Sequence, residues 1–207
     1  MTGVQTCALP ICGVVGSKTT LKVTGLPTTG THNIVWSTVV GNRWNCTTGT
    51  CWVYSPIALG TVDVANGTFE KEVTIPDHLG GWHVIQVMSG DKIEAQIPYY
   101  VKQSIVEFKD KNGKVISQGT ATFVNSTAPD VVAKGQSGVG QTKFKEGEEF
   151  TISVKGVGWT QLDNTLAVTY DNAHIGYACG FNSNGYVVVR DRKSTRLNSS
   201  HLGISYA

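Results

Sequence analysis

The chain has 207 residues and a formal net charge of +2, and 40% of its residues are hydrophobic while only 15% are charged. This composition excludes a disordered, charge-rich segment, and the small net charge argues against a nucleic-acid partner. No apolar run approaches the roughly 18 residues that a membrane-spanning helix needs, so we expect no transmembrane segment. The 24 glycines, with abundant Val, Thr and Ile, favour an all-β chain with many turns.

The two ends, residues 1–12 and 191–207, differ in character from the sequence between them. The first reads MTGVQTCALPIC and the second reads DRKSTRLNSSHLGISYA. Both resemble translated sequencing-adapter sequence, and we therefore expect the biological sequence to span about residues 13–190. Residues 13–190 carry no net charge, because the excess of basic residues lies in the second end.

The sequence between the ends begins with six short runs of β-type pattern. They are Thr19–Val23, Asn33–Val40, Ile57–Val64, Thr68–Ile75, Trp82–Met88 and Ala95–Val101. Turn signals such as Asn66-Gly67 separate them, and the absence of a long amphipathic helical pattern argues against parallel βαβ architecture. Evenly spaced short strands of this kind predict an antiparallel β-sandwich over residues 13–103. Trp36 and Trp82 lie in apolar runs and are predicted core residues.

A second set of β-patterned runs occupies residues 104–190. They are Ser104–Lys109, Lys114–Phe123, Glu149–Gly156, Leu166–Tyr170, His174–Cys179 and Tyr186–Arg190. The tetrapeptide Asp110–Gly113 predicts a hairpin between the first two, because Asn-Gly tolerates the positive φ angles of a type I′ turn. We expect a second sandwich here that lacks its last strands.

The two halves repeat weakly, and their motifs resemble a known family. The sequence LKVTG at 21–25 parallels ISVKG at 152–156. The order Asn-Gly-x-Phe at 66–69, Ile-Pro-Asp at 75–77 and Gly-x-His at 81–83 resembles the Ig-like (IPT/TIG-like) repeats of bacterial and archaeal surface proteins. The resemblance implies tandem Ig-like antiparallel β-sandwiches, the second truncated, in an extracellular or cell-surface protein.

The same resemblance indicates a function class. Such repeats commonly act as structural or adhesive modules of secreted or cell-surface proteins, whose partner would be an unknown protein or glycan. The alternative is a carbohydrate-binding or accessory module of a larger secreted enzyme. Fold alone does not choose between the two.

Cys46 and Cys51 enclose four residues that include a glycine. Such a loop can form the tip of a hairpin, and in an oxidising compartment the two cysteines would form a small disulfide. Free thiols and a metal pair are the alternatives, although a zinc site usually needs a second pair of Cys or His.

Trp44, Trp52 and Tyr54 flank the cysteine loop. Together they could form an exposed platform for sugar rings or for a protein partner. The alternative is that they pack over the end of the sandwich, as aromatic side chains often do.

The sequence offers no credible catalyst. His83 lies near Asp77, but no Gly-x-Ser-x-Gly nucleophile motif is present, and His83 occupies a place where sandwich domains often put a structural corner residue. We expect His32 to be an exposed loop residue. The acidic residues, including Asp110, do not form a calcium-loop pattern. We therefore predict that the chain is not an enzyme and has no catalytic, metal or cofactor site.

Overall fold

The structure is a computed structural model, which describes residues 12–41, 52–117, 121–122, 149–158, 165–170, 173–179, 185–192 and 202–205. Every regular element in these ranges is a β-strand, which confirms the predicted all-β class. None of the described residues belongs to a helix long and apolar enough to cross a membrane. The chain divides into two compact units, Met1–Asp77 with Trp82–Val101, and His78–Gly81 with Lys102–Ala207.

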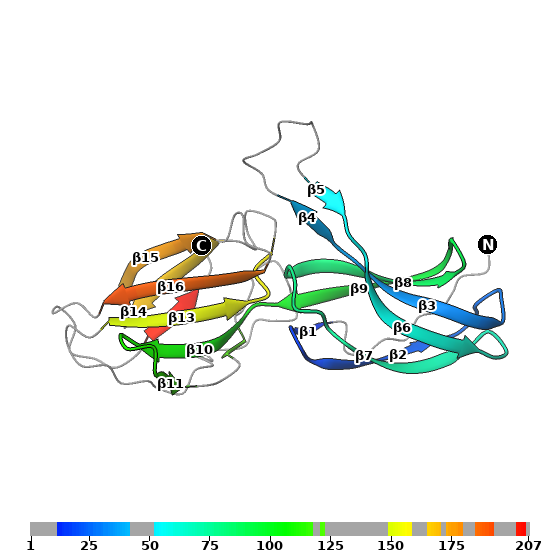
Figure 1. The fold of residues 1–207 in the computed structure, drawn as a ribbon, viewed down its shortest axis with the longest axis horizontal. Coiled ribbons are helices and arrows are strands. Elements are labelled where there is room, and N and C mark those ends of the chain that lie inside the picture. Colours follow the sequence, from blue (N-terminus) through cyan, green and yellow to red (C-terminus); the bar gives the residue numbers. More distant parts are fainter. Residues whose placement is uncertain are drawn as a thin grey trace. The chain divides into compact units, whose positions relative to one another are not determined.

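Unit 1 contains strands β1 to β9 in its described part (Figure 1). Their bounds are β1 Cys12–Val14, β2 Lys18–Val23, β3 Gly30–Ser37, β4 Val39–Gly41, β5 Trp52–Tyr54, β6 Ile57–Val64, β7 Phe69–Thr74, β8 Gly81–Ser89 and β9 Lys92–Lys102. Five of them form one sheet in the order β1-β9-β8-β3-β6, while β2 pairs with β7 and β4 pairs with β5. The pairs β3–β8, β3–β6, β2–β7 and β4–β5 are all antiparallel.

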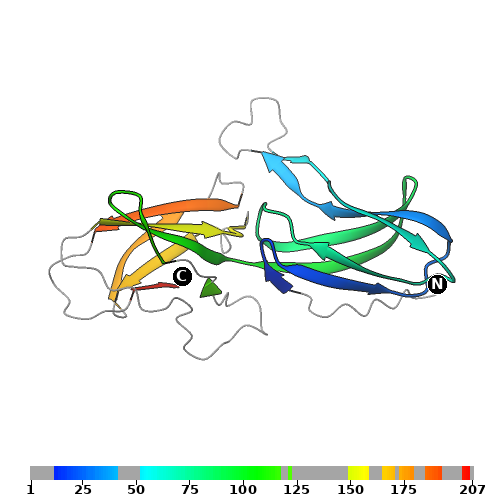
Figure 2. The same cartoon turned by 60° about the horizontal axis from the view of Figure 1, so that its bottom comes forward.

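The core of unit 1 lies between its two larger sets of strands. Leu21 of β2 and Val73 of β7 are buried in the same cluster as Ile34, Trp36 and Ile85 of the five-stranded sheet. Figure 2 shows the β2–β7 ribbon running alongside that sheet. Side chains alternate between buried and exposed along β2 and β3, as period-two strands require when one face is covered. Full burial of each aliphatic side chain contributes about 1.5–3 kcal/mol.

The turn between β6 and β7 has the geometry that its sequence predicts. Asn66 and Gly67 have φ angles of 54° and 69°, both in the left-handed region. The amide of Thr68 donates to the carbonyl of Ala65 at 3.1 Å, closing a two-residue hairpin. Positive φ at both central residues is the mark of a type I′ turn, which Asn-Gly favours.

The hairpin at Asp110–Gly113 forms as predicted, but its turn is not type I′. Gly113 has a φ of 79°, whereas Asn112 is not among the described residues with positive φ. The amide of Gly113 donates to the Asp110 carbonyl at 2.9 Å, and Asp110 Oδ1 accepts from the amides of Asn112 and Lys114 at 2.8 and 2.9 Å. One glycine in the left-handed region after a type I turn is the three-residue hairpin, and the aspartate side chain favours it by capping the turn.

Unit 2 contains strands β10 to β17 in its described part. Their bounds are β10 Ser104–Asp110, β11 Val115–Ser117, β12 Ala121–Thr122, β13 Glu149–Lys155, β14 Thr165–Tyr170, β15 Ala173–Cys179, β16 Tyr186–Arg192 and β17 Leu202–Ser205. One sheet has the order β11-β10-β13-β16, with β12 also paired to β10, and another has the order β15-β14-β17. Ile152, Val154, Val157 and Val189 supply buried apolar side chains.

Parts of both adapter-like ends are paired with the rest of the chain. Cys12 begins β1, the last two residues of β16 are Asp191 and Arg192, and β17 pairs with β14. The adapter-like origin of residues 1–12 and 191–207 and the boundary between 103 and 104 stay predictions.

Candidate functional site

Among the described residues of unit 1, the β4–β5 ribbon carries the most exposed large apolar side chains. Figures 1 and 2 both show it standing away from the other strands of unit 1. It leaves β3 after a single residue, Thr38, whose carbonyl accepts from the Ser55 amide at 2.9 Å. Val40 pairs with Val53, and these side chains are 37% and 54% exposed. The single predicted run Asn33–Val40 is thus divided between a core strand and an exposed ribbon.

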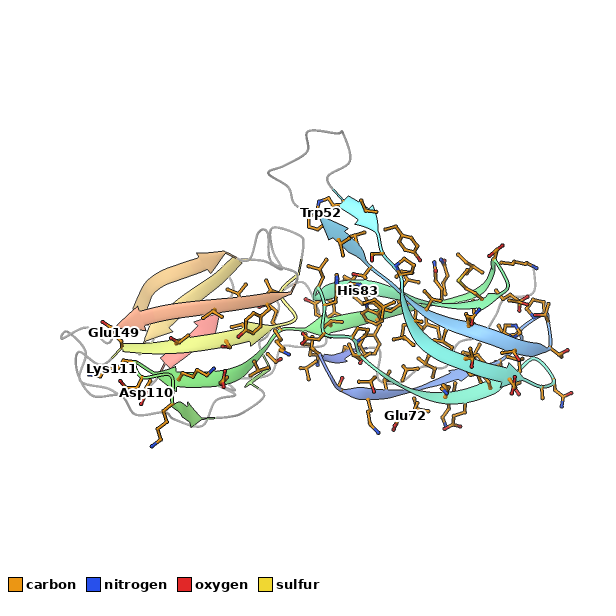
Figure 3. All side chains as sticks on the ribbon, viewed as in Figure 1. Trp52, Glu72, His83, Asp110, Lys111 and Glu149 are labelled. Atoms are coloured by element: carbon orange, nitrogen blue, oxygen red, sulfur yellow. The ribbon has the colours of Figure 1, made fainter. Side chains whose placement is uncertain are left out.

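The predicted aromatic platform is only partly described. Trp52 is half-buried, Tyr54 is 54% exposed, and Trp44 lies outside the described residues (Figure 3 labels Trp52). Trp52 and Tyr54 are two positions apart on β5, so their side chains leave the same face of the strand while Val53 leaves the other. The Tyr54 hydroxyl donates to Gln86 Oε1 at 3.2 Å, which fixes its position over β8.

The predicted disulfide also falls outside the described part of the chain. Both Cys46 and Cys51 lie in residues 42–51, which the structure does not describe. Cys12, at the start of β1, is a free cysteine. The pairing of Cys46 with Cys51 stays a prediction.

Trp82 is not a core residue, contrary to the sequence expectation. It is 51% exposed, and its ring meets the buried Tyr100 ring edge-on at a centroid distance of 5.2 Å. Its run alternates, and Trp82 falls on the outer face of β8, whereas His83 falls on the inner face.

His83 is buried against the core tryptophan. Its ring stacks on Trp36 with centroids 4.6 Å apart and an interplanar angle of 27° (Figure 3 labels His83). Its Nδ1 lies 3.0 Å from the carbonyl oxygen of Ser37, which can only accept, so Nδ1 carries the proton. These two contacts hold the His83 ring in the core, whereas Asp77, which lies near it in the sequence, is exposed.

A buried polar cluster of Thr28, His32 and Glu94 is the main feature that sequence reasoning missed. The side chains of His32 and Glu94 are 0% exposed, which overturns the expectation that His32 is an exposed loop residue. His32 Nε2 lies 2.9 Å from Glu94 Oε2. The Thr28 hydroxyl donates to the same carboxyl oxygen at 2.8 Å and lies 2.9 Å from the same ring nitrogen.

The hydrogen-bond partners define where the protons of this cluster lie. His32 Nδ1 is 3.0 Å from the carbonyl oxygen of Gly30, which can only accept, so Nδ1 is protonated. Because the lowered pKa of Glu94 favours its ionised form, which can only accept, Nε2 of His32 supplies the proton that it shares with this carboxylate and with Thr28. With Glu94 ionised, the cluster is an imidazolium paired with a carboxylate.

The electrostatics of Glu94 agree with that assignment. Burial of the carboxyl raises its pKa, but the hydrogen bonds from His32 and Thr28 and the charges of His32 and Lys92 outweigh burial, so the pKa of Glu94 lies below its ordinary value. The second oxygen, Glu94 Oε1, is buried, and none of the described residues lies within hydrogen-bond distance of it.

The cluster is not arranged as a catalytic triad. In a triad the nucleophile and the acid bind opposite nitrogens of the histidine. Here Thr28 and Glu94 both meet Nε2, the hydroxyl proton points at the carboxylate, and Nδ1 is occupied by a backbone carbonyl. The Thr28 hydroxyl is therefore a hydrogen-bond donor to Glu94, and the geometry does not activate it as a nucleophile.

Metal ligands do not gather in the described ranges. No group of three or more His, Cys, Asp and Glu side chains there could hold a metal ion. Asp110, considered as a calcium ligand, uses Oδ1 to cap its own turn.

A scan against family models and a search of curated proteins each found no match for this chain.

Proposed function

We propose that the chain is a module of tandem Ig-like antiparallel β-sandwiches that serves as a structural or adhesive unit of a secreted or cell-surface protein. In unit 1, the support comes from a five-stranded sheet and a two-stranded ribbon that share one apolar core. Two layers of antiparallel strands around one core are the architecture of a β-sandwich.

The weak internal repeat also favours a tandem arrangement. Residues 21–23 of LKVTG lie in β2, and residues 152–155 of ISVKG lie in β13. Both strands are followed by a glycine in the left-handed region, Gly25 at 80° and Gly156 at 72°. Two segments that match in sequence and share a strand ended by a positive-φ glycine are expected of two copies of one fold.

The β4–β5 ribbon is the observation that carries the adhesive role. Val40 and Val53 form an exposed apolar pair on one face of this two-stranded ribbon, and Tyr54 is exposed on the other face. The ribbon stands away from the other strands of unit 1 (Figure 1). Exposed apolar side chains that gather on one face, as Val40 and Val53 do, commonly mark an interaction site. A ribbon whose side chains do not complete the core of unit 1 is free to present them to a partner.

Adhesion of beads coated with the full chain to intact cells would test this role. We expect Val53→Thr and Tyr54→Ala to reduce the number of bound beads, because each removes apolar surface from the ribbon. Ile93→Thr is the matched control, since Ile93 is 43% exposed in unit 1 but lies outside the ribbon. Equal adhesion of the ribbon variants and the control would contradict the proposal.

A carbohydrate-binding or accessory module is the second candidate, favoured by Trp52 and Tyr54 on one face of β5. Sugar rings stack on aromatic faces, so binding to a glycan array would depend on the Trp52–Tyr54 face alone. Val53 and Tyr54 are adjacent, equally exposed and on opposite faces, which makes them a matched pair. Loss of array binding with Tyr54→Ala but not with Val53→Thr would select the carbohydrate role, and an array without signal would reject it.

A further inference from the structure

The Thr28–His32–Glu94 cluster joins three parts of unit 1 that are far apart in sequence. Thr28 lies in the connection between β2 and β3, His32 lies in β3, and Glu94 lies near the start of β9. All three side chains converge on Glu94 Oε2 or on His32 Nε2 within 2.8–2.9 Å. The contact therefore fixes the β2–β3 connection against β9 through one shared proton donor and one shared acceptor.

Filling a core with a polar cluster of this kind carries a free-energy cost. Two buried charges lose their hydration, and a well-packed apolar set of similar volume is often equally stable or more stable. The cost is increased here because Glu94 Oε1 is buried without a hydrogen-bond partner among the described residues. Stability alone thus does not explain the cluster, whereas a dependence on protonation does.

We propose that the Thr28–His32–Glu94 cluster is an acid-sensitive contact that releases the β2–β3 connection of unit 1 when Glu94 takes up a proton. Protonation leaves the imidazolium of His32 buried without its counter-charge, and removing one partner of a buried pair is strongly destabilising. It also places a proton on a carboxyl group whose Oε2 already accepts from two donors.

The direction of the pH dependence follows from the folded pKa of Glu94. That pKa lies below the ordinary value of 4.5, so the folded protein holds its carboxylate more strongly than the unfolded chain does. The ionisation of Glu94 contributes its full stabilisation above pH 4.5 and loses it as the pH falls through the lower folded pKa. His32 from β3 and Lys92 from β9 are the described charged groups that act on this carboxyl.

The segment that would be released carries a core side chain. Leu26 is 6% exposed and belongs to the core cluster of unit 1. Its amide donates to the Gly67 carbonyl at 3.0 Å, so the segment is held to the β6–β7 turn at one end and to Glu94 through Thr28 at the other. Loss of the second attachment would let water reach Leu26 while Trp36 and Ile85, farther along the same sheet, stay enclosed.

Hydrogen–deuterium exchange of the full chain tests this local release. Amide protection, corrected for intrinsic exchange, is compared at about pH 7 and about pH 2, the second well below the ordinary glutamate pKa because the folded pKa of Glu94 is lowered. We expect protection over residues 24–32 and 92–96 to fall at least about tenfold in acid, because a buried charge loses its partner there. Protection at Trp36 and Ile85 is expected to fall much less. Uniform loss, or no loss, would overturn the proposal.

Three variants separate the contact from general acid unfolding. Glu94→Gln is expected to lower protection of residues 24–32 already at pH 7 and to remove the acid step. The double variant His32→Gln with Glu94→Gln replaces the charges by neutral hydrogen-bonding groups, so it should restore protection at both pH values. Glu72→Gln, which alters an exposed carboxylate paired with Lys18, should behave as wild type. An acid step that persists in the double variant would refute the role of Glu94.

Discussion

Trp36 offers the sharpest test of how the core of unit 1 is held together. Its side chain is 0% exposed, stacks on His83 at 4.6 Å and meets Tyr99 edge-on at 5.9 Å. Yet its indole Nε1 is buried with no hydrogen-bond partner among the described residues. The residue thus combines a large favourable burial with one unsatisfied donor, and the two contributions can be separated by substitution.

Replacing Trp36 by phenylalanine removes the unsatisfied donor and keeps an aromatic ring against His83. The smaller side chain lacks three ring atoms, Nε1 and two carbons, and losing the two buried carbons costs roughly 1.6 kcal/mol at about 0.8 kcal/mol per carbon. Removing a buried N–H that lacks a partner recovers about 1–3 kcal/mol. The two contributions nearly cancel, so Trp36→Phe should change the free energy of unfolding by less than about 1 kcal/mol. Trp36→Ala leaves a cavity and should cost about 3–5 kcal/mol.

Native-state hydrogen exchange of the β3 and β8 amides measures both values, because the slowest of these amides report the opening of unit 1 as a whole. Urea unfolding followed by far-UV circular dichroism provides a second measurement that does not depend on tryptophan fluorescence. A loss above about 2.5 kcal/mol for Trp36→Phe would show that Nε1 has a partner, such as a bound water. The assignment of an unsatisfied donor in this core would then be wrong.

Four further substitutions test individual contacts, with thermal unfolding as the assay. Gly67→Ala should cost more than about 1–2 kcal/mol, the penalty of left-handed backbone alone, because its new Cβ would also lie 2.7 Å from the Leu26 carbonyl oxygen. Gly90→Ala has a similar φ of 58° and open space, so it should show the backbone penalty only, and an equal cost for both would refute the clash. Asp110→Ala removes two hydrogen bonds to turn amides and should cost about 1 kcal/mol, whereas no change would mean that Gly113 alone sets the turn. Glu72→Gln breaks an exposed ion pair and should change stability by less than about 1 kcal/mol.

Much of the strand pattern could be predicted because it depends on local chemistry. Alternating apolar residues located β2, β7 and β8 closely, and Asn66-Gly67 fixed a turn that only positive φ angles can make. The turn at Asp110–Gly113 was harder, since the sequence Asn-Gly suits two hairpin geometries. The choice between them depended on the Asp110 side chain, which caps two amides of the longer turn.

The buried cluster could not be predicted, because its members meet only through the fold. His32 and Glu94 are 62 positions apart, and nothing in either local sequence indicates the other. Polar residues at strand starts are usually exposed, which made an exposed His32 the natural expectation. Alternation along β3 is the one signal that could have found it, since His32 shares a strand face with Ile34 and Trp36.

The β4–β5 ribbon shows what strand alternation does not predict. Alternation assigns Val40 and Val53 to faces of their strands, but it does not say whether another layer covers those faces. The structure leaves both exposed, so exchanging both for threonine, a β-branched residue of similar shape, should change the free energy of unfolding by less than about 0.5 kcal/mol. Chemical denaturation of the double variant checks this value, with Ile34→Thr as the buried control expected to lose several times more. A loss above about 1 kcal/mol for the ribbon variant would mean that the valines are needed for folding, and the ribbon would no longer be available to a partner.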